Sequence, residues 1–90
     1  MPDIGYSSRA LASMDSFSSY FRARNPEVAE ALLSEIESLC ILLLDFPELG
    51  RKIPGTSLRY AVTRKYRYRV VYRMDNLQLS VVDILHPKAR

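Results

Sequence analysis

The end of the chain carries the clearest alternation of apolar and polar positions. Within residues 66–90, the segments 67–74 and 77–85 are both rich in β-branched and aromatic side chains, as is typical of β-strands. Between them lies Asp75-Asn76, a pair that tolerates the left-handed backbone of a two-residue hairpin loop. The pattern therefore predicts a β-hairpin, around which the rest of the chain is organised.

If the loop consists of those two residues, the cross-strand pairs of the hairpin follow by counting outward from it. Tyr72 is expected opposite Leu79, and Tyr68 opposite Asp83, and directly opposite side chains share one face of a sheet. One face is then apolar and predicts a core: Tyr68, Val70, Tyr72, Leu79 and Val81. The other face is basic and carries Arg67, Arg69, Arg73, Gln78, Ser80, Val82, Ile84 and, past the strand, His86.

Two amphipathic helices are predicted before the hairpin. After an N-cap at Ser7 or Ser8, apolar residues recur at three- and four-residue intervals as far as Phe21. Asn25-Pro26 interrupts this pattern, because Asn caps helices and Pro suits the first helical position. A second apolar stripe follows: Val28, Leu32, Ile36, Leu39 and Leu43. Because only a few residues join the two helices, we expect them to pack as an antiparallel hairpin.

The remaining segments complete a small sheet. Residues 3–6 predict a short first strand, whereas residues 45–55 are rich in turn-forming Gly and Pro. Segment 58–63 alternates as a half-buried strand, with its apolar set expected on the core face: Leu58, Tyr60 and Val62. That assignment places Arg59 on the basic face of the sheet.

The predicted fold is a single α+β domain over residues 1–90. A helical hairpin packs on one face of a small, mostly antiparallel sheet, in the order β-α-α-β-β-β, because the apolar sheet face and the helical stripes have no other partner. The run 39–44 is apolar on almost every side, so we expect this end of the second helix to be covered on more than one side. The opposite sheet face is left open and basic.

Composition limits the cellular location and the cysteine chemistry that we expect for this chain. No apolar run approaches the roughly 18 residues of a membrane span, and the N-terminus lacks the basic start and apolar stretch of a secretory signal. The single cysteine, Cys40, excludes an internal disulfide and a thiolate metal cluster, and it fits a small buried hydrophobe. The expected location is the cytoplasm, with no metal and no cofactor.

Charge is distributed unevenly along the chain. Residues 1–50 hold three basic residues against eight acidic ones, a net charge of −5, and residues 51–90 hold ten against two, a net charge of +8. This asymmetry favours a surface that meets an anionic partner, either a nucleic acid or an acidic protein segment. The alternative, that the two halves neutralise each other across the fold, stays open at this point.

Four segments in order resemble the RelE/ParE superfamily of bacterial toxins: NPEVAEALLSEI, FPELGRKIPGTSLR, YRYRVVYRMDN and VVDILHPKAR. The resemblance runs from about Ala10 to Arg90. It implies the fold described above and the toxic half of a type II toxin–antitoxin module, held silent by a cognate antitoxin. We expect an acidic, amphipathic segment of that antitoxin to bind the helical hairpin and a sheet edge through apolar anchors.

The resemblance implies one of two activities. RelE-like members are mRNA endonucleases that cut in the ribosomal A site, whereas ParE-like members poison DNA gyrase without nuclease chemistry. Metal-independent RNA cleavage requires a general base, a general acid and cations. The candidate nuclease set is His86, Arg64, Arg69 and Lys88. RelE-like members usually place a Tyr or a second His after the last strand, and no residue of this chain matches that position.

A ParE-like toxin is the preferred reading. His86 and Arg90 resemble the His-x-x-Arg ending of ParE-like members, with one additional residue between them. The residues predicted to bind the target or the antitoxin are Arg59, Arg67, Arg69, Arg73, His86 and Arg90. A RelE-like endonuclease, acting on the ribosome and mRNA, is the alternative. A plain nucleic-acid-binding module ranks third, because the predicted open face has no aromatic side chain on which bases could stack.

Overall fold

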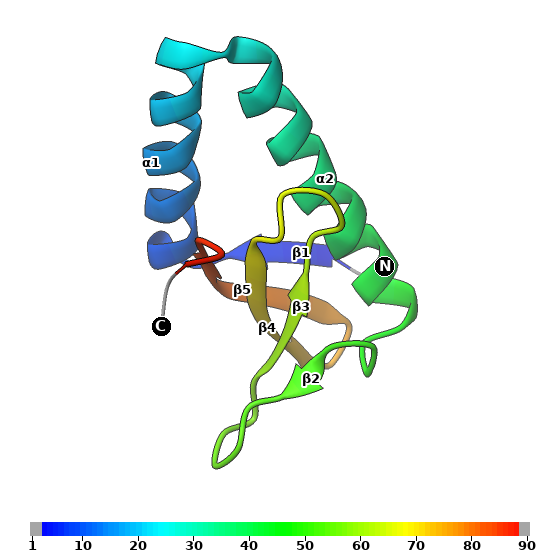
Figure 1. Cartoon of the computed structure of the whole chain (residues 1–90). Helices are drawn as coiled ribbons and strands as arrows, with labels where there is room; N and C mark the ends of the chain where they lie inside the picture. Colours follow the sequence, from blue (N-terminus) through cyan, green and yellow to red (C-terminus); the bar gives the residue numbers. More distant parts are fainter. Residues whose placement is uncertain (1–2, 89–90) are drawn as a thin grey trace.

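In the computed structural model, which describes residues 3–88, a helical hairpin packs against a five-stranded sheet (Figure 1). Its elements are β1 (Asp3–Tyr6), α1 (Ser8–Arg24), α2 (Pro26–Asp45), β2 (Arg51–Lys52), β3 (Arg59–Val62), β4 (Arg69–Asp75) and β5 (Gln78–Leu85). The strand order is β1-β5-β4-β3-β2, with β1 parallel to β5 and the other pairs antiparallel. The predicted α+β architecture is confirmed, and the short edge strand β2 is added to it.

The helices begin where their capping residues predict. The Ser7 hydroxyl oxygen accepts a hydrogen bond from the Ala10 N–H at 3.0 Å, and the hydroxyl donates to the Val82 carbonyl, which ties the start of α1 to β5. Pro26 opens α2 directly after Asn25, as predicted, but the Asn25 side chain makes no capping hydrogen bond. One side of α2 is fully buried against the sheet through Leu32, Ile36, Cys40 and Leu43.

The central hairpin has a different register from the predicted one. Its loop is Asn76-Leu77, with Asn76 in the left-handed region at φ 55°, so Tyr72 lies opposite Val81 instead of Leu79. The Asp75 carboxylate accepts hydrogen bonds from Arg73 Nε at 2.9 Å and from the Ser80 hydroxyl at 3.2 Å, which holds Asp75 in the strand. Since the pairing moves by two residues, the faces are preserved, and all five predicted core residues are buried.

A β-bulge in β5 reverses which face of the sheet the side chains after it occupy. The register passes from Tyr72 opposite Val81 to Val71 opposite Asp83, which leaves Val82 as the extra residue. Ile84 therefore lies opposite Val70 in the core and is 3 % exposed, so its predicted place on the basic face is wrong. The prediction that Asp83 faces Tyr68 is also wrong; Asp83 instead accepts a hydrogen bond from the Ser13 hydroxyl of α1.

The faces of β3 are the reverse of those predicted. Ala61 lies opposite Val70 and is buried, and so is Thr63 beyond it, whereas Tyr60 lies opposite Val71 on the open face, as does Val62 opposite Arg69. Thr63 is buried without penalty because its hydroxyl oxygen accepts the Tyr68 N–H at 2.9 Å. Arg59 consequently lies opposite Tyr72 on the helical side of the sheet, not on the open face.

The end of α2 is less covered than its sequence predicts. Ile41 and Leu42 are 52 % and 43 % exposed, although their neighbours Cys40 and Leu43 are fully buried. Because Ile41 and Leu42 are exposed, the end of α2 presents uncovered aliphatic surface next to the sheet.

Among residues 3–88 there is no helix both long enough and apolar enough to cross a membrane.

Candidate functional site

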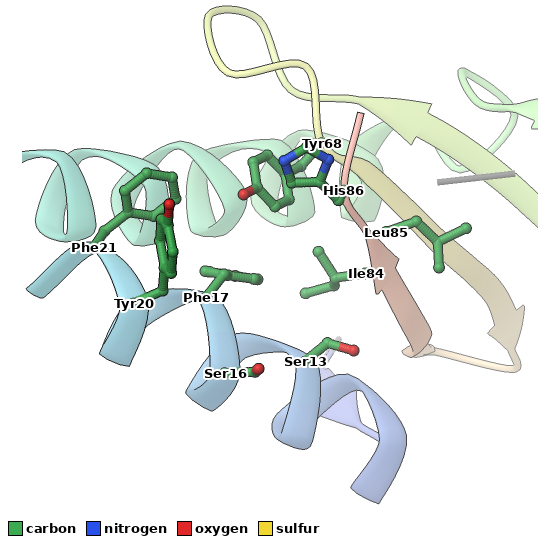
Figure 2. A pocket seen from close by; sticks show the side chains of 9 residues that line it. All are labelled: Ser13, Ser16, Phe17, Tyr20, Phe21, Tyr68, Ile84, Leu85 and His86. Atoms are coloured by element: carbon green, nitrogen blue, oxygen red, sulfur yellow. The ribbon is translucent and has the colours of Figure 1, made fainter. Parts of the chain in front are cut away.

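An aromatic groove of about 490 Å³ lies between α1, the end of β5 and Tyr68, the residue directly before β4 (Figure 2). Its lining residues are Ser13, Ser16, Phe17, Tyr20, Phe21, Tyr68, Ile84, Leu85 and His86. Helical spacing brings Phe17, Tyr20 and Phe21 to one side of α1, because residues three and four apart share a helix face. The groove is thus formed mainly by apolar and aromatic side chains from three elements distant in sequence.

His86 lies at this groove, in contact with the core. Its ring packs edge to face against Tyr68, with centroids 5.3 Å apart and planes at 72°, and Tyr68 in turn packs against Phe17 at 5.1 Å (Figure 2). The Lys88 N–H donates to His86 Nδ1 at 3.0 Å, so in the neutral imidazole the proton is on Nε2. Burial raises the pKa of the Tyr68 phenol, with the Tyr20 phenol adding to the effect, so Tyr68 stays protonated at neutral pH.

Arg59, a predicted binding residue, does not lie on the open face; its side chain binds backbone carbonyls on the helical side of the sheet. Its Nη1 donates to the carbonyls of Glu48 at 3.3 Å and Gly50 at 2.8 Å. The neighbouring Tyr72 hydroxyl donates to the Pro47 carbonyl at 2.7 Å and accepts the Gly50 N–H at 2.9 Å. These contacts fasten the segment after α2 to the sheet, so both side chains are part of a structural network.

Arg69 and Arg73 do lie on the open face, but that face is mixed in character. Arg73 is paired with Asp75, and Arg69 lies opposite Val62. Val71 on the same face is only 8 % exposed, and Tyr60 beside it is half-buried. An aromatic side chain is therefore present on the open face, and the sequence argument that excluded base stacking there is wrong.

The connection between β3 and β4 is a basic loop, which we define as residues 63–68. Its ends are joined by hydrogen bonds from the Thr63 N–H to the Tyr68 carbonyl at 2.8 Å and from the Tyr68 N–H to Thr63 Oγ1 at 2.9 Å. Arg67 was expected in the strand but lies in this loop, in the left-handed region at φ 63°. An L-residue with a side chain pays roughly 1–2 kcal/mol for that conformation. The exposed cations of the loop are Arg64, Lys65 and Arg67.

Glu35 of α2 fixes the middle of the basic loop. Its Oε1 accepts the N–H groups of Lys65 at 3.0 Å and Tyr66 at 3.1 Å. Burial by itself would raise the pKa of Glu35, but the Tyr66 amide, the Thr63 side chain and the Lys65 amide together lower it below its usual value. The loop backbone is therefore held by an ionised carboxylate at neutral pH.

A second groove, the α2 groove, lies between the exposed side of α2 and β3. It measures about 680 Å³ and is lined by Ala31, Ser34, Glu35, Ser38, Leu39, Leu42, Leu49, Val62, Thr63 and Arg64. Leu49 and the nearby Phe46 are 57 % and 59 % exposed. The sequence reasoning did not include Leu49 or Val62 in a site, although the apolar run at the end of α2 was a signal for this surface.

The predicted nuclease residues are divided between different parts of the surface. Arg64 lines the α2 groove, whereas His86 lines the aromatic groove. Lys88 is exposed and bonds to His86 only through its backbone. Arg69 lies on the sheet, and the predicted binding residue Arg90 lies outside the described residues. Within residues 3–88 there is no group of three or more His, Cys, Asp or Glu side chains able to hold a metal ion.

This α+β arrangement, with two apolar grooves beside a basic loop, has the fold of the RelE/ParE toxins. Residues 4–89 match the family model described as "ParE toxin of type II toxin-antitoxin system, parDE". The chain belongs to the ParE toxin family. It matches no curated protein sequence.

Solved structures with the same fold include both branches of the superfamily. The chromosomal ParDE system of P. aeruginosa has 16% identity and a TM-score of 0.79, covering 96% of this chain and 96% of that chain. The intact RelBE toxin–antitoxin complex of E. coli has 17% identity and a TM-score of 0.65, covering 99% of this chain and 100% of that chain. YafQ from E. coli strain BL21(DE3) has 14% identity and a TM-score of 0.60, covering 96% and 93%.

Proposed function

We propose that this ParE-family toxin inhibits DNA gyrase in the cytoplasm by binding it, and that a cognate antitoxin neutralises the toxin. The support comes from the family match and from the surroundings of His86. Within the described residues, the titratable side chains that line the aromatic groove are His86, Tyr20 and Tyr68, and burial raises the pKa of Tyr68. Tyr68 is only 4 % exposed, so its phenol has little access to a substrate, and the exposed phenol of Tyr20 is the other titratable group beside His86. A phenol is a weak acid at neutral pH, so the groove offers His86 only a weak partner for proton transfer.

The aromatic groove is better suited to binding than to cleavage of RNA. Its walls are apolar apart from two serine hydroxyls, the phenols and the imidazole. Cleavage develops negative charge on a phosphorane, which requires cations directed at that position. Within the described residues no Arg or Lys lines the groove, and the Arg24 guanidinium beside it is stacked on Tyr20, 3.8 Å from the ring centroid.

One observation favours the RelE-like alternative, an mRNA endonuclease acting on the ribosome. His86 is exposed, with its Nε2–H free of any hydrogen bond recorded in the described residues, so its imidazole is accessible to a substrate. The RelBE similarity shows a shared fold at low identity and does not distinguish the two activities. The preference for gyrase therefore rests on the ParE family match and on the incomplete acid–base set.

The proposal is tested by adding purified toxin to gyrase and relaxed plasmid DNA. We expect inhibition of supercoiling and accumulation of cleaved DNA, and both effects should disappear when the antitoxin is added first. The antitoxin is obtained by expressing the open reading frames that flank the toxin gene. Full gyrase activity at a large molar excess of folded toxin would contradict the proposal.

A further inference from the structure

We propose that the aromatic groove is a binding site for a small, uncharged, planar aromatic molecule that carries a carbonyl oxygen. The rings of this ligand pack against the aromatic side chains of the groove, and its carbonyl oxygen accepts a hydrogen bond from the Tyr68 hydroxyl. Such a site goes beyond the proposed function, because it would stand whether or not the toxin inhibits gyrase.

The phenol of Tyr68 is a buried donor without an acceptor. Tyr68 is 4 % exposed, and its hydroxyl makes no hydrogen bond recorded in the described residues. Among residues 3–88 no fully enclosed side-chain oxygen or nitrogen lacks a partner, so the Tyr68 hydroxyl opens onto the groove that it lines. Figure 2 shows its oxygen directed towards the side of the groove where Tyr20 and Phe21 lie. A few convergent polar groups in an otherwise apolar hollow are typical of a small-molecule site.

The polar groups around Tyr68 favour an acceptor in the ligand. Burial raises the pKa of the Tyr68 phenol, and the Tyr20 phenol raises it further, so Tyr68 keeps its proton and the two hydroxyls lie near each other. His86 adds the Nε2–H of its neutral imidazole, since its Nδ1 accepts the Lys88 N–H. A carbonyl oxygen has two lone pairs, so it can accept from Tyr68 and from one further donor.

The rings of the groove are suited to a flat ligand. Phe17, Tyr68 and His86 are joined by edge-to-face contacts, with centroids 5.1 Å and 5.3 Å apart. Tyr20 and Phe21 form another edge-to-face pair at 5.2 Å. Rings held in this way present faces and edges against which a planar aromatic molecule packs favourably. The volume of about 490 Å³ lies in the range of roughly 300–1,000 Å³ that is common for small-molecule sites.

The lining disfavours a charged ligand and an aliphatic one. The residues that line the groove include no Arg, Lys, Asp or Glu. A carboxylate that entered would lose its hydration without gaining an ion-pair partner, and such a loss is costly. An aliphatic molecule would fill the volume but leave the Tyr68 donor unpaired. An uncharged aromatic carbonyl compound avoids both costs.

The test titrates three related probes into the full-length toxin at pH 8 and follows binding by NMR. Coumarin is planar, uncharged and carries a carbonyl; 2H-chromene has the same ring system without the carbonyl; coumarin-3-carboxylate adds a negative charge. We expect coumarin to bind about three- to tenfold more tightly than 2H-chromene, the effect of one net hydrogen bond, and more tightly than the carboxylate. The largest shifts should be those of Phe17, Tyr68 and His86.

Tyr68→Phe removes the proposed donor and keeps the ring. This variant should bind coumarin and 2H-chromene equally, with unchanged affinity for 2H-chromene. Its melting temperature should equal or exceed that of the wild type, because the lost hydroxyl has no partner recorded in the described residues. Tyr60→Phe, on the open face of the sheet, is the matched control and should keep the preference for coumarin.

The location of the site is tested separately on α1. Ser16 lines the groove, whereas Ser19 on the same helix does not, and both are exposed. Ser16→Leu should obstruct the groove and weaken the binding of coumarin and 2H-chromene about fivefold or more. Ser19→Leu adds the same side chain outside the groove and should bind both probes as the wild type does.

Four results would overturn the inference, and none of them bears on gyrase inhibition. Absence of coumarin binding up to its solubility limit would remove the site. Equal affinities of the wild type for coumarin and 2H-chromene would mean that the Tyr68 hydroxyl takes no part. Tighter binding of coumarin-3-carboxylate than of coumarin would assign the groove to an anion. Undiminished coumarin binding by Ser16→Leu would place the ligand elsewhere on the toxin.

Discussion

The imidazole of His86 packs edge to face against the ring of Tyr68, with ring centroids 5.3 Å apart. Tyr68 is 4 % exposed, so this contact fixes a surface histidine to a core side chain at the end of β5. The Lys88 N–H bonded to Nδ1 further limits rotation of the ring. The position of His86 is therefore set by packing, and the aromatic groove beside it is preformed.

The β-bulge at Val82 predicts a large stability cost for Ile84→Ala. Ile84 is 3 % exposed and packs in the core opposite Val70. Deleting most of such a side chain should reduce the free energy of unfolding by about 2–4 kcal/mol. Urea denaturation followed by circular dichroism gives this value, with Leu77→Ala as a control that should cost far less. A loss below about 0.5 kcal/mol would mean that Ile84 lies on the open face.

The Tyr72 hydroxyl is predicted to hold the segment after α2 in place. It donates to the Pro47 carbonyl and accepts from the Gly50 N–H in a site where Tyr72 is 1 % exposed. Tyr72→Phe should lower the free energy of unfolding by about 1–3 kcal/mol, because both backbone groups lose a partner. Hydrogen exchange should also become faster at the Gly50 amide.

Tyr20→Phe is the control for that substitution, since Tyr20 is 53 % exposed and its hydroxyl makes no hydrogen bond recorded in the described residues. Its stability should remain within about 0.5 kcal/mol of the wild type. Equal stabilities for the two phenylalanine variants would show that the Tyr72 hydrogen bonds contribute nothing to the fold.

Glu35 should make the stability of the toxin depend on pH. Its pKa in the folded chain lies below the ordinary value of 4.5, so its contribution is fully present above pH 4.5 and is lost as the pH falls through the folded value. Glu35→Ala should therefore be less stable than the wild type at pH 7, by about 1–2 kcal/mol, and this difference should shrink below pH 4.5. Thermal melts over pH 3 to 7 provide the measurement.

Glu35→Gln separates the charge from the hydrogen-bonding geometry. Its amide oxygen can still accept the two loop N–H groups, so it should retain part of the stability at pH 7 without the same acid dependence. A pH profile of Glu35→Ala that runs parallel to the wild type would contradict the assigned role.

The fold class followed from the sequence because its strongest signals are local. The N-caps, the Asn25-Pro26 break and the two apolar stripes depend on neighbouring residues, and they placed both helices. The five predicted core residues of the hairpin were correct even with a shifted loop, since moving the pairing by two residues keeps each side chain on its face.

The errors arose where tertiary structure overrides the alternation of side chains. A bulge at Val82 exchanges the faces for Asp83 and Ile84, and period-two counting has no means of locating it. In β3 the buried side is taken by Ala61 and Thr63, because the Thr63 hydroxyl is satisfied by backbone and small side chains fit there. Larger apolar residues were expected there on hydrophobicity alone.

The candidate site was only partly accessible from sequence. A surplus of cations in the second half was visible, but their separation among the open face, the basic loop and the Arg59 network depends on register and backbone conformation. The left-handed Arg67 has no sequence signature, because Gly or Asn would be expected at such a position. The α2 groove joins Leu42, Leu49 and Val62, which only the folded chain brings together.

The central claim is that this toxin acts by binding and not by cleaving RNA. The most direct measurement is mRNA cleavage on translating ribosomes by purified wild-type toxin, with His86→Ala as the matched variant and gyrase supercoiling assayed on the same preparations. We expect no ribosome-dependent cleavage by either protein, together with gyrase inhibition by the wild type. Ribosome-dependent cleavage by the wild type that falls about 10²-fold or more in folded His86→Ala would contradict the account.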